Sequence, residues 1–132
     1  MNREILFRGK RIDNGWWMEG YCSKYFDGFK TATCIAQPTR ETITGSLCYE
    51  VDPSTVGQYT GLTDKNGKRI FEGDILRQKK NGVYGFPFSV VFDDGGFMWN
   101  ENERRDFLYQ SICDTCEVIG NIHDSPELLE GE

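Results

Sequence analysis

The sequence lacks the residues and patterns on which most enzyme mechanisms and membrane anchors depend. It contains a single histidine, His123, among 132 residues, which removes most general-base schemes built on imidazole. It has no Ser-His-Asp order, no glycine loop for phosphate and no metalloprotease motif. No apolar run approaches the length of a membrane span, and residues 1–4 begin no apolar signal region. We therefore expect a non-enzymatic protein of the cytoplasm, with no cofactor and no membrane partner.

Cysteine is present, but not in the pattern of a disulfide framework. The chain has five cysteines at irregular spacing, and an odd number fits reduced thiols in a reducing compartment. Cys113 and Cys116 form the one Cys-x-x-Cys pair, which can supply half of a zinc site. A structural site needs four ligands, so Cys22, Cys34, Cys48 or His123 would have to complete it across the fold. We expect no metal here; a redox dithiol is the other alternative, although the βαβ context of such motifs is missing.

Aromatic residues, glycine and a localised negative charge are what the sequence has in quantity. Nine Phe, six Tyr and three Trp can bury a large area, and 15 Gly indicate many tight turns. The formal net charge is −6, and residues 101–132 hold nine acidic residues against two basic ones. The rest of the chain is nearly balanced, so the low pI does not exclude a basic local face.

Short strands separated by glycine-bearing turns predict a mainly β fold. The expected strands are residues 4–12, 16–22, 31–36, 41–51, 58–63, 68–71, 74–77, 88–92, 97–99 and 117–122. We expect turns at 13–15, 64–67, 79–82 and 93–96, a loop at 24–30, a break at 52–54 and a helical turn within 101–109. Ser125-Pro126-Glu127 is typical of a helix start, so a short C-terminal helix should pack Leu128 and Leu129 on the sheet.

These elements predict one domain over residues 1–132, with N-terminal strands in 1–50 and the remaining strands and the helix in 51–132. A small barrel or a sandwich fits the pattern, and the Glu-Gly-Asp-Ile-Leu turn at 72–76 favours an SH3-like element.

The most specific pattern is the segment 51–75, which has an Asn66-Gly67 hairpin turn at its centre. This segment resembles the signature of the YopX family, small proteins encoded by bacteriophages and prophages. Residues 3–11 and 118–129 resemble the beginning and the end of the same family. The signature residues are Gly57, Gln58, Tyr59, Thr60, Gly61, Leu62, Asp64, Asn66, Gly67, Glu72, Gly73 and Asp74.

The resemblance implies a phage or prophage origin, a bacterial cytoplasmic location and a largely β, barrel-like fold. It implies no established activity and no catalytic residues. The signature itself favours a structural role, because its glycines suit turns and close packing and its carboxylates suit turn N–H groups.

Basic residues suggest one alternative function, the binding of single-stranded nucleic acid by a small barrel. The candidate contacts are Arg8, Lys10, Arg11, Arg77, Lys79 and Lys80, with Trp16, Trp17, Tyr84 and Phe86 as stacking surfaces. Against this, the acidic C-terminal quarter would repel phosphate, or would itself imitate nucleic acid.

Three hypotheses remain at this point. The first is a non-enzymatic phage accessory protein that binds a host or phage macromolecule or assembles into a homo-oligomer, since edge strands of small β domains pair readily. The second is the nucleic-acid-binding barrel, and the third is a domain stabilised by zinc or acting in redox chemistry through Cys113 and Cys116.

Overall fold

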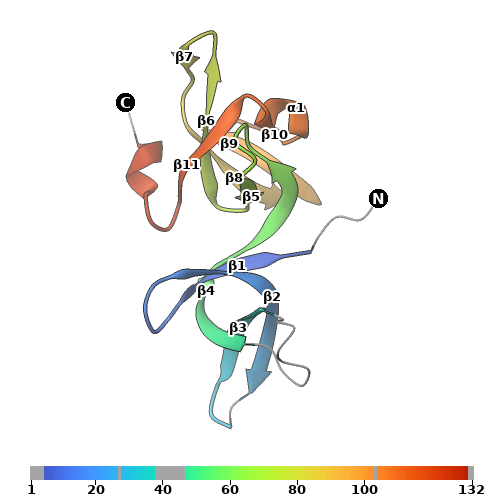
Figure 1. Ribbon diagram of the computed structural model, residues 1–132, viewed down its shortest axis with the longest axis vertical. Coiled ribbons are helices and arrows are strands. Elements are labelled where there is room, and N and C mark those ends of the chain that lie inside the picture. Colours follow the sequence, from blue (N-terminus) through green and yellow to red (C-terminus); the bar gives the residue numbers. More distant parts are fainter. Residues whose placement is uncertain (1–4, 27, 38–46, 103, 131–132) are drawn as a thin grey trace. The chain divides into compact units, whose positions relative to one another are not determined.

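The computed structural model describes residues 5–26, 28–37, 47–102 and 104–130, which are mainly β as the sequence predicts (Figure 1). The strands are β1 (Phe7–Arg11), β2 (Trp17–Phe26), β3 (Thr31–Gln37), β4 (Leu47–Thr63), β5 (Arg69–Phe71), β6 (Asp74–Lys80), β7 (Val83–Tyr84), β8 (Phe88–Asp93), β9 (Gly96–Glu101), β10 (Arg104–Phe107) and β11 (Cys116–Asn121). The helical elements are α1 (Gln110–Cys113) and the 3-10 turn η1 (Pro126–Leu129). Within the described residues, no helix has the length and apolarity that crossing a membrane requires.

The strands form two antiparallel sheets, and the chain divides into two compact units, residues 1–59 and 60–132. The first sheet has the order β1-β2-β3-β4-β5, and β1 also pairs with β4, so four strands of the first unit pair in a closed cycle. The second sheet has the order β10-β9-β8-β6-β11, and β7 folds back on β6 (Figure 1). The long strand β4 begins in the first unit and ends in the second.

Two glycines allow the strands of the first unit to approach closely. A Cβ at Gly20 would lie 2.3 Å from the carbonyl oxygen of Ala36, and one at Gly9 would lie 2.8 Å from a methyl group of Val51. Such distances exclude any side chain, so glycine is required where the strands meet. Ile35 and Val51 are fully buried beside these contacts.

The second unit has its own apolar core. Its fully or nearly buried members are Ile70, Leu76, Phe88, Val90, Leu108, Cys113 and Cys116. Leu62, Trp99, Ile112 and Val118 pack against this cluster and remain partly exposed. The core therefore draws on β5, β6, β8, β11 and α1, which come from all parts of the second unit.

Three predicted local elements were wrong. Strand β2 continues to Phe26, where the sequence suggested a loop, because its residues pair with β3 in an unbroken register. Strand β4 runs through residues 52–54, and the pairing with β1 shifts register between Arg8 and Lys10, which accommodates Pro53. Residues 104–107 form strand β10 instead of a helical turn, and the helix begins only at Gln110.

The ends of other predicted elements also differ. Strand β6 extends through Lys79 and Lys80, so the turn is confined to Asn81 and Gly82, both with positive φ. The C-terminal helix is a 3-10 turn without a side-chain cap from Ser125; Leu128 lies against Gly120, while Leu129 is exposed. Residues 41–46 of the expected strand 41–51 lie outside the described residues.

Candidate functional site

The signature segment is organised around the carboxylate of Asp64, which is 4% exposed. One oxygen accepts the backbone N–H groups of Asn66 (2.8 Å) and Lys68 (2.9 Å), and the other accepts the N–H of Val118 (3.0 Å). Burial raises the pKa of Asp64, but the three N–H donors outweigh it and hold the pKa below its ordinary value. The ionised carboxylate therefore ties the 64–68 turn to β11.

Other signature side chains are also bonded to the backbone. The hydroxyl of Thr60 donates to the carbonyl of Ile70 at 2.8 Å, and the carboxylate of Asp74 accepts the N–H of Phe71 at 2.8 Å. Gly67 has a φ of 80°, which suits the turn that Asp64 closes. These contacts give the signature a structural role in positioning β4, β5 and β6.

Cys113 and Cys116 lie in the apolar core of the second unit and have no exposed surface. Burial raises the pKa of the Cys113 thiol to about 12 and raises the pKa of the Cys116 thiol as well, so both are protonated at neutral pH. Among the residues that the structure describes, no three His, Cys, Asp or Glu side chains are grouped to hold a metal ion.

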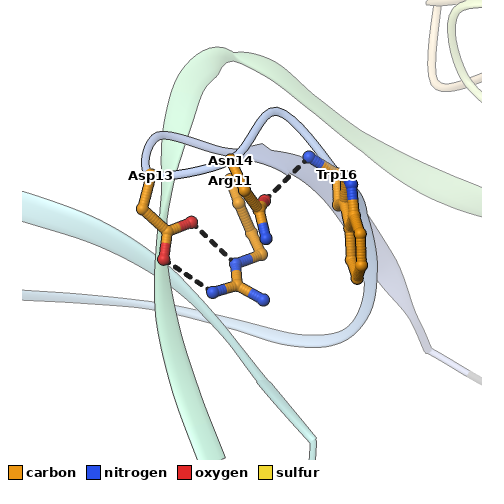
Figure 2. A network of polar contacts seen from close by, with 4 residues as sticks. All are labelled: Arg11, Asp13, Asn14 and Trp16. Atoms are coloured by element: carbon orange, nitrogen blue, oxygen red, sulfur yellow. Dashed lines mark hydrogen bonds and ion pairs between the residues drawn. The ribbon is translucent and has the colours of Figure 1, made fainter.

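The six candidate nucleic-acid contacts divide between the two units. In the first unit the guanidinium of Arg11 donates to both carboxylate oxygens of Asp13, at 2.8 and 2.6 Å (Figure 2). It also lies 4.0 Å from the centre of the Tyr49 ring. The hydrogen bonds with Asp13 raise the pKa of Arg11 and lower that of Asp13. Arg8 is nearly buried, 4.9 Å from the ring centre of Trp17.

The same β1–β2 turn is closed by Asn14, whose side-chain oxygen accepts the N–H of Trp16 (Figure 2). Lys10 lies 5.9 Å from the ring centre of Trp17, and its backbone N–H donates to the hydroxyl of Thr55. The cations of Arg8, Lys10 and Arg11 thus lie beside aromatic rings of the same unit, and Arg11 is also paired with a carboxylate.

In the second unit the β6–β7 hairpin carries the other three cations. Arg77 and Lys79 lie over the ring of Tyr84, at 4.1 and 5.1 Å from its centre, and Lys80 is exposed. Tyr84 itself is 49% exposed. This hairpin places cations beside an open aromatic ring, as the nucleic-acid hypothesis requires.

On the second unit there is also a hollow of about 300 Å³, which the sequence analysis did not predict. Its lining residues are Gln78, Gly85, Phe86, Phe88, Trp99, Glu101 and Ile112. Phe88 and Trp99 meet edge to face, with ring centres 6.3 Å apart and an angle of 66° between the planes. Phe86 is 68% exposed. The sequence feature that could have indicated this hollow is the alternation of side chains along β9, which places Trp99 and Glu101 on the same face of the strand.

The amide of Gln78 is fixed at the wall of this hollow. Its Nε2 donates to the hydroxyl of Thr115 at 2.8 Å, and its backbone carbonyl accepts the N–H of Gly85 at 2.7 Å. The hollow therefore combines aromatic walls with one oriented amide and one carboxylate. Such a combination of apolar surface and a few polar groups is typical of binding sites.

The described residues thus form a mainly β protein whose second unit carries a small open hollow. The model of the YopX protein family matches residues 6–130, and the chain belongs to this family. The crystal structure of protein EF1440 from Enterococcus faecalis is similar, with 27% sequence identity and a TM-score of 0.56. The similarity covers 97% of this chain and 99% of that chain. No curated protein matches.

Proposed function

We propose that this chain is a non-enzymatic accessory protein of a bacteriophage or prophage, which binds another macromolecule in the bacterial cytoplasm. The observation that carries the proposal is the hollow of the second unit, which is lined by the exposed Phe86, the partly exposed Trp99 and Glu101, together with the nearly buried Phe88. Aromatic side chains gathered at an open surface are characteristic of recognition sites. The phage setting rests on the resemblance to the YopX family.

A non-enzymatic role is supported by the way the reactive groups are used. The carboxylate of Asp64 is occupied by three backbone N–H groups, and the thiols of Cys113 and Cys116 are buried and protonated. These groups take part in the hydrogen bonding and packing of the second unit.

Self-assembly through strand β10, one of the two edge strands of the second sheet, has less support. The outer strand β10 carries Arg104 and Arg105, both exposed, and charged side chains on an edge strand oppose pairing with another copy. We therefore place the partner surface at the hollow.

The experiment is affinity capture from phage-infected bacteria, comparing the wild-type chain with two matched variants. Phe86→Ser removes an aromatic ring of the hollow, while Val83→Ser changes a side chain of similar exposure in the adjacent strand β7, 69% against 68%. A macromolecule retained by the wild type and by Val83→Ser, but lost with Phe86→Ser, is the expected result. Equal retention by all three chains, or by none, would contradict the proposal.

Single-stranded nucleic acid is a second candidate partner, favoured by the open ring of Tyr84 beneath Arg77 and Lys79. A gel-shift titration at low salt tests it with two charge reversals. Lys79→Glu with Lys80→Glu should abolish binding, while Lys65→Glu with Lys68→Glu, on the 64–68 turn, should leave most of it. Absence of a shift at micromolar protein, or equal effects of the two double variants, would exclude this candidate.

A further inference from the structure

The hollow of the second unit has a negative character. Glu101 is the one ionisable side chain among its lining residues, and it is partly buried. A carboxylate beside apolar walls is screened less than one in open water, so it attracts a cation more strongly. An anionic ligand such as a phosphate would be repelled at this position.

The net charge of the whole second unit also favours a cationic ligand over an anionic one. Residues 60–132 contain fourteen Asp and Glu against eight Lys and Arg, while residues 1–59 contain seven of each. The formal charge of −6 therefore belongs to the unit that carries the hollow. Such a field favours encounters with a basic partner and opposes those with nucleic acid.

The aromatic walls suit a cation as well. Phe88 and Trp99 line the hollow in edge-to-face contact at 66°, Trp99 is partly exposed, and the exposed Phe86 adds a third ring. Ring faces attract ammonium and guanidinium groups, and Trp is the most effective of the aromatic side chains. Tyr84 already attracts Arg77 and Lys79 within the same hairpin.

The neighbouring cations do not fill the hollow. Arg77 and Lys79 flank Gln78 in β6, so strand alternation directs them to the opposite face, and neither lines the hollow. Arg104 is paired with Glu101 across β9 and β10, but it is exposed and does not line the hollow either. The volume of about 300 Å³ is at the lower end of the range for ligand sites, which suits one side chain better than a whole cofactor.

We propose that this hollow receives an arginine or lysine side chain from a basic segment of a partner protein. The cation would contact the rings of Trp99 and Phe86 and form an ion pair with Glu101, while its aliphatic stem packs on Phe88 and Ile112. The inference rests on the proposed function and specifies the chemistry of the partner.

The test uses short Gly-Ser peptides that differ in one central residue. One peptide contains arginine and its control contains citrulline, the neutral isostere; a second pair contains lysine and norleucine. Binding is followed by the indole N–H resonance of Trp99 in ¹⁵N-labelled protein, with peptide up to millimolar concentrations. Trp99→Phe assigns that resonance among the three indoles of the chain.

We expect the arginine or lysine peptide to shift the Trp99 indole and to bind about tenfold more tightly than its neutral control. Glu101→Gln should weaken that binding about tenfold, whereas Glu127→Gln, an exposed acid of η1, should change it less than about twofold. Unchanged melting curves for both variants would show that the unit remains folded.

Two results would overturn the inference. One is equal binding of the charged and neutral peptides, or no binding of either; the other is a shift of the Trp99 indole by oligothymidine but not by the basic peptides. If Phe86→Ser still abolishes capture of a partner in either case, the proposed function stands and only the chemistry of the partner is wrong. If that capture also fails, both proposals fall.

Discussion

Replacing Asp64 with asparagine tests whether the family signature acts through its buried carboxylate. Asparagine keeps one oxygen for the N–H groups of Asn66 and Lys68, but its NH₂ group then faces the N–H of Val118, where the present distance is 3.0 Å. A hydrogen bond to a charged group contributes about 1.5–3 kcal/mol, so the loss of one bond and the weakening of two should cost about 3 kcal/mol. For a unit of this size that corresponds to a fall in Tm of roughly 10 °C or more.

The pH dependence of the same variant gives an independent check. Because the folded pKa of Asp64 lies below its ordinary value of 3.8, its stabilising effect is complete above that pH and is lost as the pH falls through the folded pKa. The wild type should therefore lose stability on acidification, and its advantage over Asp64→Asn should shrink below about pH 4. Urea unfolding followed by circular dichroism, at pH 7 and pH 3, measures both effects.

A matched control is Asp94→Asn, which makes the same charge change in another hairpin turn. Asp94 is exposed and has a φ of 50°, a conformation that asparagine also adopts readily, so its stability should change by less than about 0.5 kcal/mol. Equal stability of Asp64→Asn and the wild type at neutral pH would refute the role assigned to Asp64. So would a difference between them that does not depend on pH.

Two further predictions concern close packing and thiol burial. Gly20→Ala should destabilise the first unit by about 2 kcal/mol or more, measured by chemical unfolding, because its Cβ would clash with the Ala36 carbonyl; Gly85→Ala, with no atom nearer than 3.7 Å, should be tolerated. Cys48 should react with a thiol reagent in the native protein, while Cys113, buried and with its pKa raised to about 12, should react only on unfolding. Rapid labelling of Cys113, or a wild-type unfolding midpoint for Gly20→Ala, would contradict these assignments.

The residues that sequence patterns identified best are those whose roles are local. The Asp93–Gly96 turn and the alternating strands β8 and β9 follow from side-chain size and backbone freedom over a few residues. A turn also forms at 64–67, but it is centred on Lys65 and Asn66, and only Gly67 has a positive φ. The family signature was recognised for a related reason, since its glycines and carboxylates form a continuous pattern. At 24–26 and 52–54 the local sequence predicted a loop and a break, but both segments form strand. Pairing with a neighbouring strand outweighed the local preference there.

The candidate site also depends partly on features that the sequence predicts and partly on features that only the structure reveals. The sequence by itself determined a mainly β chain of the YopX family, with its negative charge concentrated toward the C-terminus. Only the tertiary structure brought Gln78 of β6 together with Phe86, Trp99 and Glu101, and only it enclosed Cys113 and Cys116 in the core. The physical reason is that a hollow is formed by side chains distant in sequence, whose proximity depends on strand order and register, and neither is encoded in any one segment.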